Sequence, residues 1–109
     1  MPLSAAQLTT DMLAAAKTTA GQQWTEIKTA VTFEFRILAQ RLVQIVKLRS
    51  SGEIDDETAR LFFSIAHNNC IGAIAMTTAL VAIAVKRIVD SALNVAKEAV
   101  NSAIGFALV

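Results

Sequence analysis

The stretch Ser50-Ser51-Gly52-Glu53-Ile54-Asp55 is the clearest interruption in the regular pattern of this sequence. Gly52 suits the left-handed backbone position that follows many helix ends. Asp55 is a typical N-terminal cap, and Asp56 and Glu57 stand where the dipole of a following helix favours negative charge. A short turn of this kind joins antiparallel helices. The stretch therefore predicts a turn at 50–55 between two helices that lie side by side.

Before this turn, apolar residues recur every three or four positions between residues 22 and 49. This spacing is typical of one buried helix face. Within it, Val31-Thr32-Phe33-Glu34-Phe35-Arg36-Ile37 alternates strictly, which is the period of a half-buried strand. A strand needs a partner, and the sequence holds no second alternating run. A helix over 22–49 is therefore favoured, and in that helix Phe33 points away from the main apolar face.

After the turn, the sequence predicts one long helix over about 56–104. From Cys70 to Val85 the sequence is a run of sixteen residues in which only Thr77 and Thr78 are not apolar. A membrane-spanning helix needs roughly 20 such residues. A helix buried in a bundle is therefore favoured, and a membrane-associated protein that uses segment 70–85 remains the alternative.

A further helix is expected over about 4–20, with Ser4 as its cap and Gly21 as its stop or as a soft point in a longer helix. The predicted fold class is all-α, a long antiparallel helical hairpin in a single domain over 1–109. The N-terminal helix could form a separate helix beside this hairpin. A chain that bends near Gly21 and Asn68 could instead fold back as a compact monomeric bundle.

The composition indicates more apolar surface than one hairpin can bury. Hydrophobic residues make up 54% of the chain without glycine, and charged residues make up 17%. An average soluble domain has roughly 45–50% of the former with glycine included and roughly 25% of the latter. We therefore expect a homo-oligomer, with a dimer favoured, in which two hairpins complete a four-helix bundle. The residues expected at this interface are Trp24, Val31, Phe33, Phe35, Ile37, Ile74, Leu80, Val81 and Ile83.

Few residues have the chemistry of a catalytic or metal site. His67 and Cys70 lie one helical turn apart, and Glu34 could approach them from the first long helix. A structural zinc site takes four ligands and a catalytic one three, so a structural histidine beside a buried thiol is favoured over a metal site. No motif points to a cofactor or to catalysis. The sequence thus predicts a non-enzymatic structural or protein-interaction module, with a small ligand- or metal-binding bundle as a further alternative.

Partners and location follow from the charges and from the single cysteine. Arg36, Arg41, Lys47 and Arg49 form a basic cluster, but acids just past the turn oppose phosphate, so nucleic-acid binding is not favoured. An unknown protein partner stays open beside self-association. One cysteine suits a reducing compartment, and the first residues lack the charged start of a secretory signal. The expected location is the cytoplasm.

Overall fold

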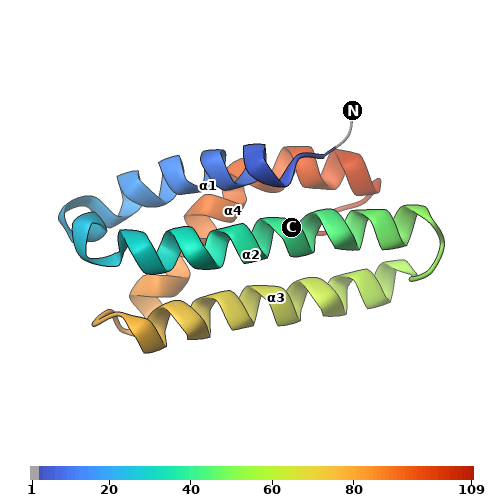
Figure 1. Cartoon of the computed structure of the whole chain (residues 1–109). Helices are drawn as coiled ribbons and strands as arrows, with labels where there is room; N and C mark the ends of the chain where they lie inside the picture. The colour runs from blue at the N-terminus through green and yellow to red at the C-terminus, as the bar shows by residue number, and fades with distance from the viewer. Residues whose placement is uncertain (1–2) are drawn as a thin grey trace.

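A computed structural model describes residues 3–109 of the chain, and the described part is all-helical without a strand. This confirms the predicted all-α class. The elements are α1 (Ala5–Ala20), the 3-10 turn η1 (Gly21–Gln23), α2 (Trp24–Ser50), α3 (Asp56–Thr77) and α4 (Ala82–Ile104) (Figure 1). Residues 1 and 2, which belong to the N-terminal stretch considered above for a secretory signal, lie outside the described range. The radius of gyration is 13.5 Å, close to the roughly 13 Å of a compact chain of 100 residues.

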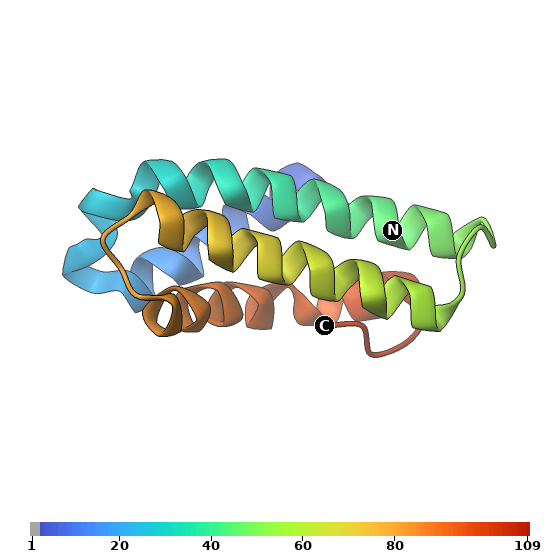
Figure 2. The ribbon, with the colours of Figure 1, turned by 90° about the horizontal axis from the view of Figure 1, so that it is seen from below.

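The four α-helices surround one core. Consecutive helices run antiparallel, and α4 lies on the far side of the core from α2, with α1 and α3 between them (Figures 1 and 2). α4 crosses obliquely from the end of α3 to pack along α1, so it covers α3 less fully than it covers α1. The chain closes this core by itself, without a second hairpin.

Segment 31–37, whose alternation resembled a strand, lies within α2. Phe35 is fully buried, whereas Phe33 is 63% exposed. Two residues that are two positions apart share a face in a strand but lie about 200° apart around a helix. The predicted outward position of Phe33 is therefore confirmed.

The predicted single helix over 56–104 is wrong, because the chain reverses direction between Thr77 and Ala82. The hydroxyl groups of Thr77 and Thr78 donate hydrogen bonds to carbonyls of the preceding turn, and Thr78 itself is extended (φ −126°, ψ 170°). An unbroken helix over 56–104 would be roughly 70 Å long and would leave its second half without a partner. The reversal lets α4 bury Val85, Val89 and Val100 in the common core. The expected bend at Asn68 is absent, since α3 runs through this residue.

Three of the expected interface residues belong to the core instead. Val31, Phe35 and Ile74 are at most 1% exposed within the single chain. They were assigned to an interface because the sequence alone did not reveal that α4 folds back and covers them. Segment 70–85 is also divided between the end of α3 and the start of α4, so it does not form one continuous helix that could span a membrane. None of the helices in residues 3–109 is long and apolar enough to cross a membrane.

Candidate interaction site

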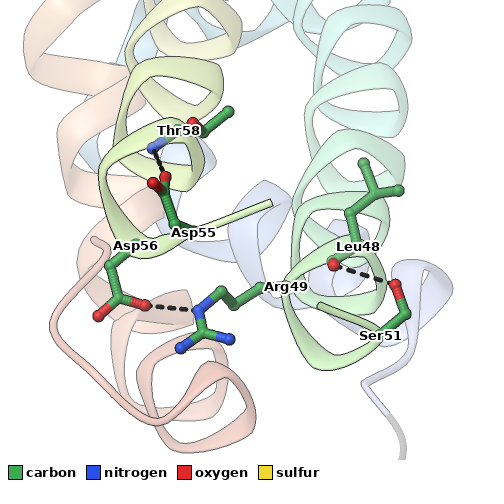
Figure 3. A network of polar contacts seen from close by, with 6 residues as sticks. All are labelled: Leu48, Arg49, Ser51, Asp55, Asp56 and Thr58. Carbon is green, nitrogen blue, oxygen red and sulfur yellow. Dashed lines mark hydrogen bonds and ion pairs between the residues drawn. The ribbon is translucent and has the colours of Figure 1, made fainter. Parts of the chain in front are cut away.

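The turn between α2 and α3 is held by its own polar groups (Figure 3). The Asp55 carboxylate accepts a hydrogen bond from the backbone N–H of Thr58 at 2.8 Å, and this bond holds the pKa of Asp55 below its usual value. Arg49 and Asp56 form an ion pair across the turn. Gly52 has a positive φ of 80°. These contacts confirm the predicted cap and turn, and they account for the acidic cluster structurally.

Because this turn sets α2 and α3 side by side, their outward surfaces form one continuous face. We call it the α2–α3 face. It is built from residues spaced three or four positions apart on each helix: Phe33, Glu34, Ile37, Arg41, Gln44 and Leu48 on α2, and Leu61, Phe62, Ile65, Asn69 and Ala73 on α3.

Large apolar side chains are exposed on this face. Phe33 is 63% exposed, Leu61 58%, Ile65 54% and Phe62 40%. Scattered exposed apolar residues are normal on a protein surface, but Leu61, Phe62 and Ile65 lie within five positions of one another on α3 and form a group of the kind that marks contact sites, with Phe33 further along the same face. The α2–α3 face is therefore the candidate interaction site.

Two shallow hollows follow the seam between the helices. The larger, of about 330 Å³, is lined by Arg41, Gln44, Ile45, Leu48, Phe62 and Ile65. The smaller, of about 180 Å³, is lined by Glu34, Ile37, Leu38, Arg41, Ala66, Asn69, Cys70 and Ala73. Arg41 lies between the two hollows. The two hollows can receive side chains from a partner helix.

Glu34 and Arg41 are the two charged residues that border these hollows. They are seven positions apart on α2, which corresponds to about 10.5 Å along the helix axis. α3 carries no acid from residue 58 to its end at Thr77. The face thus combines an apolar surface with one negative and one positive charge.

His67 belongs to a different contact, between α3 and α4. Its Nε2 atom lies 2.7 Å from a carboxylate oxygen of Asp90, and the other oxygen accepts a hydrogen bond from Lys86 Nζ at 2.6 Å. The ring also stacks on Phe63, with 5.7 Å between centroids. Partial burial works to raise the pKa of Asp90, but the bonds from Lys86 and His67 outweigh it and hold that pKa below its usual value.

Cys70 faces the opposite neighbour, α2, where it borders the smaller hollow with Glu34. Burial, helped by the Glu34 carboxylate, raises the pKa of the Cys70 thiol to about 12. The structure thus directs His67 toward α4 and Cys70 toward α2, so it does not bring together the three candidate metal ligands. No cluster of three or more ligating side chains occurs in the part of the chain that the structure describes.

The substitution Asp90→Asn is expected to lower the free energy of unfolding by about 1 kcal/mol at pH 7, because it removes the carboxylate charge that His67 and Lys86 contact. The loss is small because these contacts are partly exposed to solvent. Because the folded pKa of Asp90 is lowered, this contribution is present above about pH 4 and is lost as the pH falls further. Urea unfolding at neutral and acidic pH measures both effects. Glu98→Gln, at an exposed acid of the same helix, is the control. An equal loss for Asp90→Asn at both pH values would contradict the account.

No protein-family model matches the chain, and no curated protein or solved structure matches it either. Its function is therefore inferred from its own residues.

The expected interface residues fall into three groups. Phe33 and Ile37 lie on the α2–α3 face, and the three residues corrected above lie in the core. Trp24 is half-buried at the start of α2, and Leu80, Val81 and Ile83 lie around the α3–α4 turn. Sequence reasoning missed the exposed residues of α3, because the surplus apolar surface was sought in segments 24–37 and 70–85 and not in residues 61–65. The three large apolar residues Leu61, Phe62 and Ile65, grouped within five positions of α3, were the available signal.

Proposed function

We propose that the protein is a non-enzymatic interaction module that self-associates through the α2–α3 face. The observation that supports this proposal is the patch of exposed apolar side chains there, in which Phe33, Leu61 and Ile65 are each more than half exposed. Burial of such a patch against a second copy is the main favourable contribution to association. The two-fold symmetry of most dimers requires that the patch be complementary to itself.

The charges of the face meet this requirement in one arrangement. If α2 packs antiparallel on α2 of a second copy, with the two-fold axis near Ile37, Glu34 of each copy lies opposite Arg41 of the other. The axis falls midway between these two residues, which are seven positions apart. In the same arrangement α3 packs on α3 of the second copy. The two hairpins then form a four-helix bundle at the interface, in addition to the core inside each chain.

The non-enzymatic part of the proposal is supported by the roles of the two residues best suited to catalysis. His67 is bonded to Asp90. Cys70 is buried and keeps its proton at neutral pH, because its pKa is raised to about 12. A protonated thiol is a poor nucleophile. A reduced, buried cysteine also fits the proposed cytoplasmic location.

Sedimentation equilibrium in detergent-free buffer tests the proposal. We expect a dimer at micromolar concentration. Ile65→Asp should weaken it about 30-fold or more, which corresponds to about 2 kcal/mol, because a charge would enter the centre of the patch. Since Ile65 is 54% exposed, the fold of each chain should persist, as circular dichroism can verify.

The matched control is Val95→Asp, which places the same new charge on α4 at a residue 49% exposed and away from the α2–α3 face. It should leave the dimer intact. A wild-type chain that stays monomeric well above micromolar concentration would rule out self-association. Equal weakening by both variants would place the contact elsewhere.

A further inference from the structure

The most exposed large apolar side chains gather at one end of the molecule. Met76 is 88% exposed, Ile83 84% and Val81 70%, more than any other large apolar residue in the described range. They flank the reversal between α3 and α4. This end also holds the α1–α2 turn, at one extremity of the 42 Å long axis (Figures 1 and 2).

This apolar turn differs in shape from the α2–α3 face. It is a connection at one end of the molecule, beside the α1–α2 turn, which reaches further along the long axis, whereas the α2–α3 face is a seam between two helices with hollows along it (Figures 1 and 2). Exposed apolar side chains at the end of a molecule are suited to contact with a lipid surface. An amphipathic element bound to a membrane places its apolar side only about 5–10 Å below the headgroups, so a short turn is sufficient for such contact.

The charge around the turn is net positive, with Glu26 in the first turn of α2 as the acid that opposes it. The sequence has no acid from residue 58 to residue 89. Arg87 follows Ile83 by one helical turn, on the same side of α4, and forms no ion pair among the residues that the structure describes. Lys17 lies in the last turn of α1 and Lys28 in the second turn of α2, so both approach the same end. Basic residues beside an apolar tip favour a surface that carries negative charge.

We propose that the α3–α4 turn docks on an anionic lipid surface, with Val81 and Ile83 in the apolar boundary layer and Arg87 at the phosphate groups. The basic residues and the apolar tip provide two signals, and stable membrane attachment requires more than one. Val81, Ile83 and Arg87 lie outside the α2–α3 face, although Met76 continues the α3 row of that face. One copy can therefore bind lipid through its end while its side binds another copy.

Flotation of the full-length chain with lipid vesicles tests the proposal. We expect binding to vesicles of phosphatidylcholine mixed with phosphatidylserine, and binding at least about tenfold weaker to phosphatidylcholine alone. Trp24, the single tryptophan, lies at the start of α2 at the same end. Its fluorescence should therefore be quenched by brominated lipid in the same vesicles.

Two substitutions separate the apolar and the charged contributions. Ile83→Asn should weaken binding to the mixed vesicles about tenfold, because it removes an apolar side chain from the boundary layer. Arg87→Gln should reduce the preference for phosphatidylserine. Val95→Asn, at a residue of α4 that is 49% exposed and lies away from both proposed contact surfaces, is the matched control and should bind like the wild type. Circular dichroism verifies the fold of each variant.

The outcomes are distinct from those of the self-association test. The monomeric variant Ile65→Asp should still bind vesicles, and Ile83→Asn should still form the dimer. The proposal is overturned if the wild type binds neither kind of vesicle. It is also overturned if Ile83→Asn binds as tightly as the wild type, or if Val95→Asn loses as much binding as Ile83→Asn.

Discussion

Replacing Phe35 by alanine is expected to lower the free energy of unfolding by about 3–5 kcal/mol. Phe35 is fully buried and is among the largest side chains with no exposed surface in the chain. The substitution removes its apolar burial and leaves a cavity that the surrounding helices fill only in part. Domains of this size are stable by roughly 5–15 kcal/mol. Urea unfolding followed by circular dichroism should therefore show a large shift of the midpoint.

Phe33→Ala is the matched control, because it makes the same chemical change two residues away at a side chain that is 63% exposed. It should cost less than about 0.5 kcal/mol. The pair also tests the helical state of segment 31–37. In a strand the two rings would share one face, and both substitutions would have similar costs. Equal losses would therefore contradict the helix.

The turn at 50–55 and the helices that flank it could be predicted because their signals are local. Gly52 adopts a left-handed conformation, and the Asp55 side chain bonds to a backbone N–H three residues away. Ser4 likewise caps α1, and Gly21 at its end has a positive φ. Such features depend on the conformation of one or two residues, so the residue type is informative without knowledge of the rest of the fold.

The reversal at 78–81 could not be predicted in the same way. Thr77-Thr78-Ala79-Leu80-Val81 contains neither glycine nor proline, and Val81, in the cap position before α4, provides no side-chain cap. The driving force is tertiary, since the second half of the predicted helix gains burial only when it returns to pack along α1. Local propensity is a weak guide when long-range packing decides the outcome. The same limit explains why Val31 and Ile74 were expected at an interface.

The candidate site was predictable only in part for the same reason. Phe33 stood out because it departs from the main apolar stripe of its own helix. Ile65 did not stand out, because its exposure depends on which side of α3 is covered by α2 and which by α4. The sequence indicated that surplus apolar surface exists, and the arrangement of the helices determines where it lies.

Reversing one charge of the α2–α3 face is expected to disrupt the proposed dimer. In Arg41→Glu, each copy would place a new carboxylate opposite Glu34 of the other copy, so two repulsive pairs would form about one two-fold axis. Like charges brought together at an interface cost several kcal/mol, and we expect the dissociation constant to rise about 100-fold or more. Sedimentation equilibrium measures this change. Arg36→Glu, an exposed residue of α2 that borders a hollow toward α1 instead, should have a much smaller effect.

The double reversal Glu34→Arg with Arg41→Glu should restore the dimer, because it exchanges the two charges and recreates opposite pairs across the axis. Within one chain the two residues are about 10.5 Å apart along α2, so their direct interaction contributes little to the fold of the monomer. Restoration by the second substitution would therefore report contact between copies. If the double variant remains as weak as Arg41→Glu, the antiparallel arrangement is wrong.

The double reversal also separates the two symmetric ways in which hairpins can pack face to face. With the two-fold axis parallel to the helices, α2 would lie over α3 of the second copy. Glu34 and Arg41 would then face the part of α3 that carries no acid. Neither the single nor the double reversal would have a large effect, although Ile65→Asp would still weaken the dimer. Loss with Arg41→Glu, followed by recovery in the double variant, is expected only when α2 meets its own copy antiparallel.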